Sequence, residues 1–164
     1  MIAQKTRYAL RALLFLVEQG RGQAVPLRQI AESQSIPRSY LELIMLDLKL
    51  AGLVESVRGP KGGYRLKRHP QAISFGEVVR ALEGPLALVP CASVNFYAKC
   101  GDCHDEATCA IRRAFTLVRD RSSEVLDAIT LEVGARWELR LDGQPATEAE
   151  TRALRRDVPA NWQI

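Results

Sequence analysis

The sequence has no long apolar run, and it has no cysteine outside one short segment. The most apolar stretch, ALLFLV at residues 12–17, is far shorter than the ~18 residues that a membrane span needs. Glu18 ends this stretch and no small-residue cleavage site follows, which favours a helix of the folded protein over a signal peptide. A chain of 164 residues can also bury a core without disulfide bonds. We therefore expect a cytoplasmic protein that does not enter a membrane.

The common fingerprints of enzymes are absent as well. There is no glycine-rich phosphate loop and no dinucleotide-binding fingerprint. His104 follows Cys103 directly, but nothing around the pair resembles a known cysteine-hydrolase pattern. The sequence therefore predicts a binding protein rather than an enzyme.

Acidic residues are scarce in the first half of the chain. Residues 1–70 carry 12 Lys and Arg against 5 Asp and Glu, a net charge of +7, whereas residues 71–164 carry 11 against 14, a net charge of −3. Such an asymmetry indicates that the first half binds a polyanion, with an arginine-rich surface composition as the alternative reason. Nucleic acid is the candidate polyanion.

The first 84 residues have the pattern of a winged helix. Apolar residues recur at helical spacing over residues 5–19, and Pro26 and Pro37 are well placed to open two further short helices, the last ending at Gly52. The stretch LVESVRGPKGGYRLKR then reads as a hairpin, and Ser74 with Glu77 predicts a capped helix over 74–83. In this order of elements one helix lies in the major groove and the hairpin, or wing, reaches the DNA backbone or the minor groove.

All four cysteines lie between residues 91 and 109, in a segment with little periodicity. We call residues 85–110 the cysteine loop; it is too long to be an idle connection, so something should order it. Four thiolates can bind tetrahedral zinc or complete a 2Fe-2S or 4Fe-4S cluster, and without metal they can form a disulfide under oxidant. The candidate ligands are Cys91, Cys100, Cys103 and Cys109.

A long helix is expected after the cysteine loop, over residues 108–133. Its apolar positions are spaced 4, 3, 4, 3, 4 and 3 residues apart, as in a coiled coil interrupted by Ser122 and Glu132. We interpret residues 111–135 as a dimerisation helix; packing of an amphipathic helix against its own domain is the alternative. Residues 136–164 form a C-terminal extension with weak patterns. The predicted architecture is thus mainly α, with domains at 1–84, 85–110, 111–135 and 136–164.

The first turns of the helix that follows Pro37 are expected to face base edges. Glu42 either reads cytosine N4 or forms a salt bridge within the protein, and Tyr40 is either a contact or part of the core. The wing tip has little core to join, so its cations are expected at phosphates. The candidate DNA-binding residues are Arg38, Ser39, Tyr40, Glu42, Arg58, Lys61, Arg28 and Arg7, with Lys5 as a further phosphate contact.

Four segments together resemble the IscR/NsrR/CymR group of bacterial winged-helix repressors over residues 4–133. These segments are TRYALRALLFL, IPRSYLELIMLDLKLAGLVESVRGPKGGYRL, FGEVVRALEGP and the cysteine cluster followed by a long helix. The resemblance implies a homodimeric transcription factor that binds a palindromic operator in double-stranded DNA. It also implies crossed long helices at the dimer interface and, as in many members, an iron-sulfur cluster between the winged helix and that interface.

The cysteine spacing departs from the pattern of the group. Members commonly have three cysteines, often C-x(5)-C-x(5)-C, whereas this chain has C-x(8)-C-x(2)-C-x(5)-C. Some nitric-oxide-sensing members use an acidic ligand from the first helix, and here that helix offers none before Glu18. A local fourth ligand is therefore expected, with Cys100 ahead of His104, Asp102 or Asp105. Zinc and a metal-free thiol switch remain the alternatives to the cluster.

Overall fold

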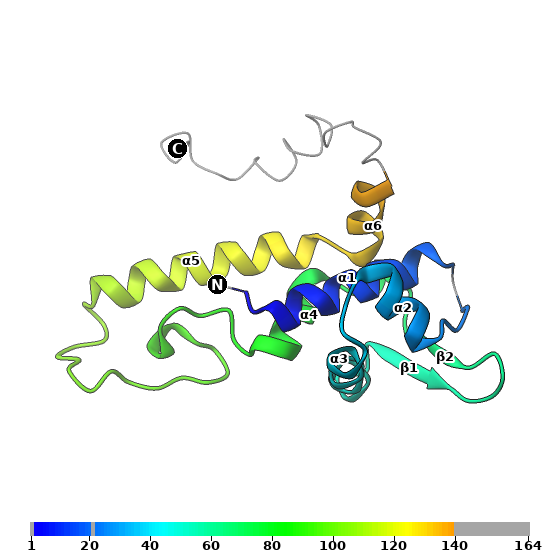
Figure 1. The fold of residues 1–164 in the computed structure, drawn as a ribbon. Coiled ribbons are helices and arrows are strands. Elements are labelled where there is room, and N and C mark those ends of the chain that lie inside the picture. The colour runs from blue at the N-terminus through cyan, green and yellow to red at the C-terminus, as the bar shows by residue number, and fades with distance from the viewer. Residues whose placement is uncertain (1, 21, 140–164) are drawn as a thin grey trace.

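The computed structural model describes residues 2–20 and 22–139, which form a mainly helical chain with one small sheet (Figure 1). The C-terminal extension predicted for residues 136–164 lies largely outside these residues. The elements are α1 (Gln4–Glu18), α2 (Leu27–Gln34), α3 (Arg38–Leu50), β1 (Val54–Val57), β2 (Gly63–Leu66), α4 (Phe75–Glu83), α5 (Ala110–Ala128) and α6 (Leu131–Leu139), with short 3₁₀ turns at Pro70–Ala72 and Pro90–Ala92.

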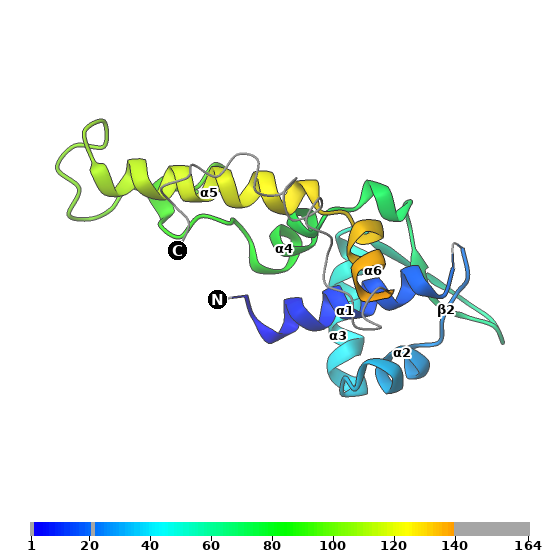
Figure 2. The ribbon, with the colours of Figure 1, turned by 90° about the horizontal axis from the view of Figure 1, so that it is seen from above.

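Helix α1 lies at the centre of the fold. Figures 1 and 2 show α6 crossing it on one side and α3 on the other. A helix covered on both sides should be apolar around most of its circumference, and residues 12–16 are accordingly all buried. The run ALLFLV is thus part of the core. Among the described residues, no helix combines the length and the apolar character needed to cross a membrane.

The predicted helix-turn-helix is confirmed and begins where the prolines indicate. Pro26 and Pro37 each occupy the N-cap position, of α2 and α3. Four side chains of α3 are fully buried at helical spacing and fix this helix to the core: Leu41, Ile44, Met45 and Leu48. Truncating one of them to alanine should cost about 2–5 kcal/mol, so the outer face of α3 is held rigidly in place.

Strands β1 and β2 form the predicted antiparallel wing, with Val54 opposite Leu66 and Val57 opposite Gly63. The connecting residues 58–62 project from the sheet. Near the tip end of the strands, one pair before the connecting loop, Tyr64 forms a β-bridge with Val25, which joins the hairpin to the segment before α2. A Cβ on Gly63 would lie 2.1 Å from the Val25 carbonyl oxygen, so the second glycine of the GGY stretch permits this close approach.

Helix α4 begins as predicted, because the Ser74 hydroxyl accepts a hydrogen bond from the Glu77 backbone N–H at 3.1 Å. The Glu77 carboxylate pairs with Arg68 at the foot of the wing. At the other end of α4, Glu83 accepts hydrogen bonds from the Ala3 N–H at 2.7 Å and the Thr6 hydroxyl at 2.6 Å. Glu83 thereby caps the start of α1 and holds the two helices together.

The prediction of one continuous helix over residues 108–133 is wrong at its C-terminal end. Helix α5 stops at Ala128; Ile129 is extended, and Thr130 forms a bridge with Ser74. The Thr130 hydroxyl accepts from the Val133 N–H at 3.3 Å and so caps the separate helix α6. The chain turns because Leu131 is fully buried, which removes Glu132 from the predicted coiled-coil seam.

Candidate DNA-binding surface and cysteine loop

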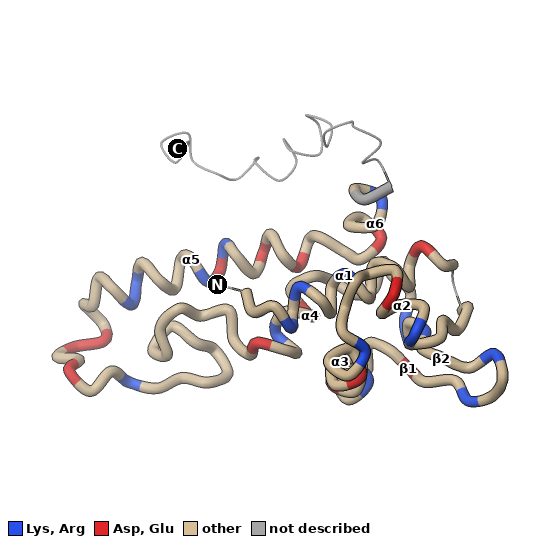
Figure 3. Tube along the Cα trace, in the orientation of Figure 1, with Lys and Arg blue, Asp and Glu red and all other residues tan. Residues whose placement is uncertain are grey.

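The outer face of α3 and the tip of the wing lie on the same side of the molecule, below α1 in Figure 1. Arg58 and Lys61 are exposed at the wing tip, and Figure 3 shows basic positions on the projecting loop. Arg38 and Ser39 are exposed on the first turn of α3. The structure therefore places the predicted helix contacts and the predicted wing contacts on one surface.

Three of the predicted DNA-binding residues, Arg38, Glu42 and Arg28, have ion-pair partners within the protein. Arg38 Nε lies 3.2 Å from a carboxylate oxygen of Glu42, and Arg28 Nε lies 2.6 Å from Glu32. The Glu32 hydrogen bond and charge raise the pKa of the Arg28 guanidinium. Both pairs are exposed i,i+4 pairs and hence weak, so their arginines are free to exchange the partner for a phosphate or a base.

The other candidates divide between the core and the surface. Tyr40 is half-buried, and its ring stands edge-on to that of Tyr8 at 6.0 Å between centroids, so this aromatic packs at the rim of the core. Arg7 is exposed on α1. Lys5 is ion-paired with Asp47 of α3 at 2.5 Å and therefore ties α1 to α3.

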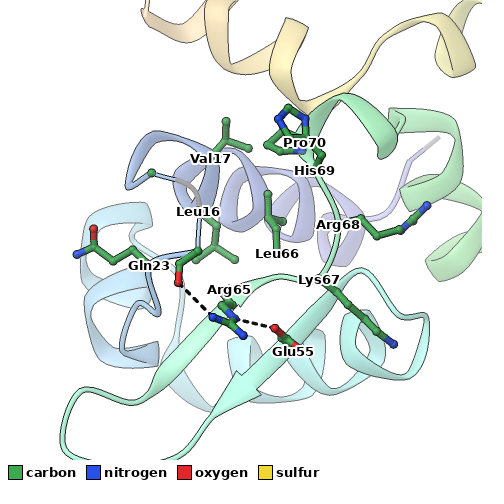
Figure 4. A pocket seen from close by; sticks show the side chains of 12 residues that line it. Leu16, Val17, Gln23, Glu55, Arg65, Leu66, Lys67, Arg68, His69 and Pro70 are labelled. Atoms are coloured by element: carbon green, nitrogen blue, oxygen red, sulfur yellow. Dashed lines mark hydrogen bonds and ion pairs between the residues drawn. The ribbon is translucent and has the colours of Figure 1, made fainter.

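A pocket of about 230 Å³ lies between the end of α1 and the base of the wing (Figure 4). Its charged residues serve the fold: Arg65 bonds to Glu55 at 2.6 Å and to the Gly22 carbonyl at 3.4 Å. The side chains of Lys67 and Arg68 point away from its interior in Figure 4. The pocket supports the wing and gathers no free charged group toward a ligand.

The cysteine loop lies at the opposite end of the molecule from the wing, alongside the N-terminal half of α5 (Figures 1 and 2). Cys91 is buried in a 3₁₀ turn and Cys100 is exposed, yet their sulfur atoms approach to 3.7 Å. The hydrogen bond to Cys91 raises the pKa of the Cys100 thiol. Cys103 lies in a turn in which its backbone N–H donates a hydrogen bond to the Cys100 carbonyl.

Cys109 is the N-cap of α5, where its sulfur accepts from the Arg112 N–H at 3.5 Å. The Asp105 carboxylate accepts from the Thr108 hydroxyl and the Ala107 N–H, which lower its pKa, so Asp105 orders the turn into α5. His104 is exposed beside it. Across the part of the chain that the structure describes, no three His, Cys, Asp or Glu side chains are gathered closely enough to hold a metal ion.

Two arginines of α5 hold the cysteine loop, a feature that sequence reasoning missed. Arg112 Nε donates to the Cys91 carbonyl at 3.1 Å, and its guanidinium lies 5.7 Å from the centre of the Tyr97 ring. Two helical turns further along the same face, Arg119 donates a hydrogen bond to the Ala92 carbonyl. No sequence pattern marks these contacts, because the acceptors are backbone carbonyls of an irregular segment.

The C-terminal end of α5 is attached to the winged helix. Asp127 accepts from both terminal nitrogens of Arg80 on α4, at 2.6 and 3.2 Å, and from the Ser74 hydroxyl at 3.3 Å. The Phe75 N–H donates to the Ile129 carbonyl at 2.8 Å. Helix α5 therefore connects the cysteine loop to the helix that packs behind α3.

The fold and the surface define the class of protein: a helix-turn-helix followed by a basic wing is a winged-helix regulator. The sequence profile of the Rrf2 family, described as an iron-dependent transcriptional regulator, matches residues 2–133. The chain belongs to the Rrf2 family of transcriptional regulators. This membership confirms the resemblance and the assignment to regulators rather than enzymes.

Individual relatives agree with this assignment. An HTH-type regulator of Rhodobacter capsulatus described as rrf2-like is 45% identical over 135 residues, covering 80% of this chain and 90% of the relative. The regulator IscR of Vibrio cholerae is 40% identical over 126 residues, covering 77% and 68%. The structure of CymR, the global cysteine regulator of Bacillus subtilis, has a TM-score of 0.69 at 35% identity and covers 84% of this chain and 97% of CymR.

Proposed function

We propose that the protein is a homodimeric transcriptional repressor of the cytoplasm that binds a palindromic operator. Residues 37–45 of the α3 segment would enter the major groove, and the wing at 58–64 would contact the flanking backbone. What supports this is the shared surface of α3 and the wing together with the membership in a regulator family. In this arrangement the wing cations would contact phosphates and supply affinity, and Glu42 would supply specificity by exchanging its Arg38 partner for a base.

The proposed dimer interface is the outer face of α5. No residue of this 19-residue helix is buried, although Ile111, Val118 and Val125 are apolar and repeat every seven residues. Their exposed fractions are 63%, 37% and 42%. An apolar stripe with this period is the surface that a second long helix covers in a coiled coil. Two copies joined there would place two α3 helices on successive major grooves of a palindrome.

The proposed switch is an iron-sulfur cluster held by Cys91, Cys100, Cys103 and Cys109, with His104 as a substitute ligand. Binding it would require the cysteine loop to rearrange, because only Cys91 and Cys100 lie close together in the described structure. Thiolates are the donors that such clusters require, and the family description as iron-dependent favours this choice. When bound, the cluster supplies a redox-sensitive and labile group. The protein's part is to order the cysteine loop against α5 and to keep Cys91 shielded from solvent.

A metal-free thiol switch is the second candidate, favoured by the 3.7 Å approach of the Cys91 and Cys100 sulfurs. Oxidation of the two thiols by a peroxide would join the sulfurs, with loss of two protons and two electrons to the oxidant. A CymR structure from Staphylococcus aureus has been solved in an oxidized form, covering 84% of this chain at 32% identity and a TM-score of 0.63. Zinc, which the same thiolates bind, would instead hold the loop without a redox response.

The placement of α5 carries the proposal. Its first half holds the loop backbone through Arg112 and Arg119, and its last turn holds α4 through Asp127. A change in the loop therefore shifts α5 relative to the winged helix and alters the distance between the two α3 helices of a dimer. Only a few kcal/mol between the two arrangements is needed to change operator occupancy many-fold.

The experiment that tests the chemistry is anaerobic purification followed by absorption spectroscopy and metal analysis. Visible charge-transfer bands are expected, and they should disappear in Cys91→Ala, Cys103→Ala and Cys109→Ala but persist in the control Lys99→Ala from the same loop. A colourless protein with stoichiometric zinc would contradict the cluster. A metal-free protein that releases its operator reversibly on oxidation would establish the thiol switch instead.

A further inference from the structure

The outer face of α3 carries a stripe of leucines that the proposed contacts do not explain. Leu43, Leu46 and Leu50 have exposed fractions of 58%, 51% and 78%. A single exposed leucine needs no explanation, but side chains at i, i+3 and i+7 lie on one face of a helix and form a continuous apolar surface. We call these three residues the leucine stripe.

The leucine stripe lies within the candidate DNA-binding surface. At about 100° per residue, Leu46 projects from the middle of the exposed face of α3, close to the direction of Ser39 two turns earlier. One edge of the face is polar, with Arg38, Glu42 and Lys49, and Lys49 reaches the wing by bonding to Ser56 at 2.9 Å. Leu43 lies toward the opposite edge. The stripe therefore runs along the part of α3 that would point into a groove.

The charges around the stripe indicate what covers it. Cations of α3 stand at its polar edge, and the wing tip adds Arg58 and Lys61 on the same side of the molecule. A purely apolar partner would leave Lys49, Arg58 and Lys61 without counter-charges, whereas a DNA duplex supplies phosphates to them. Inside the major groove the one apolar group on the base edges is the 5-methyl group of thymine. Leucine side chains facing those edges match this group.

We propose that Leu43 and Leu46 contact thymine methyl groups and thereby select thymines in each operator half-site. The inference rests on the proposed function, since it requires that α3 enters the major groove. Residues near the N-terminus of a recognition helix approach base edges, and Leu43 and Leu46 lie in the second and third turns of α3. Leu50 is the last residue of α3, about 18 Å along the axis from Arg38, and lies beyond the bases.

The test uses duplexes in which single thymines become deoxyuridine. The operator is first selected from random duplexes with the full-length protein. Deoxyuridine keeps the O4 acceptor and the base pair of thymine and removes only the methyl group. We expect one or two positions per half-site at which this replacement weakens binding about fourfold, the effect of losing one buried methyl-sized group.

Alanine variants connect each effect to a side chain. Leu43→Ala and Leu46→Ala should each bind the thymine and deoxyuridine duplexes equally at one position, because the partner of the methyl group is then gone. Leu50→Ala, the matched control on the same stripe, should keep the full fourfold difference. All three leucines are exposed, so the variants should keep the thermal stability of the parent.

Three results would overturn the inference. Equal binding of every deoxyuridine duplex by the parent protein would show that no methyl group is read. A fourfold loss that persists in both alanine variants would assign the methyl contact to another residue. A change in sedimentation of DNA-free protein on Leu43→Ala or Leu46→Ala would show that a second copy covers the stripe. Failure of the selection to yield any preferred sequence would instead contradict the proposed function itself.

Discussion

The connection between the cysteine loop and α5 can be cut without touching a cysteine. In the double variant Arg112→Gln with Arg119→Gln, the guanidinium donors to the Cys91 and Ala92 carbonyls are lost while glutamine retains good helix propensity. We expect the cysteine loop of this variant to bind and lose its cluster as in the parent protein, but the change in the loop should no longer shift α5. The measured quantity is the switching ratio, the operator affinity with the loop loaded divided by the affinity with the loop emptied.

The size of the effect follows from the two hydrogen bonds. A hydrogen bond from a charged donor contributes about 1.5–3 kcal/mol when buried, and partial exposure reduces this toward about 1 kcal/mol each. The Arg119 side chain is 19% exposed, so it retains much of its contribution. Together the pair supplies about 2 kcal/mol, enough to sustain a switching ratio of up to about thirtyfold. In the double variant the ratio should fall toward one.

The assay is fluorescence anisotropy titration of an operator duplex under nitrogen, with loaded and emptied samples of one preparation. Arg121→Gln is the matched control, because Arg121 lies on the same helix and pairs only with Glu124, at 2.8 Å, among the described residues. Its switching ratio should equal that of the parent. An undiminished ratio in the double variant would refute the role of α5 as the connection between loop and winged helix.

Three further predictions concern other parts of the molecule. Arg58→Ala should weaken binding to all duplexes and flatten the salt dependence by about one unit of slope, whereas Glu42→Ala should mainly relax base preference. Titrations of each variant against several duplexes at several salt concentrations separate the two effects. An unchanged base preference in Glu42→Ala would make Glu42 a structural residue. Val125→Glu should give monomers by sedimentation with poor operator affinity, and unchanged dimers would place the interface elsewhere. Glu83 has a lowered pKa, chiefly through the Thr6 hydroxyl and then the Ala3 N–H, so its stabilisation is present above its ordinary value of 4.5 and is lost as pH falls through the lower folded value. Acid melts of Glu83→Gln should lack this component, and a parent-like pH dependence in that variant would contradict it.

Much of the winged helix could be predicted because its determinants are local. Pro26 and Pro37 fix helix starts, Ser74 supplies a cap, and the glycine-rich turn separates two apolar strands; each acts through neighbours within a few residues. These same residues set the position of α3 and the wing. The surface proposed for DNA could therefore be predicted from local sequence patterns alone.

The end of α5 could not be predicted in the same way. The seven-residue pattern continues through Ile129, and nothing local shows that Leu131 belongs to the central core rather than to the seam. Thr130 is the one local residue that indicates a new helix start, since threonine is a common N-cap. A threonine inside a continuous helical pattern does not by itself show that the preceding helix ends. The same limit applies to Arg112, whose carbonyl partner lies 21 residues earlier in a loop without periodicity.

Operator affinity in three states of the cysteine loop tests the central claim most directly. One preparation of the full chain is titrated with the selected operator after anaerobic reconstitution with iron and sulfide, after removal of metal under reductant, and after oxidation. The account predicts that at least one state differs from another by tenfold or more in affinity, with the dimer intact throughout. Equal affinity in all three states would contradict it.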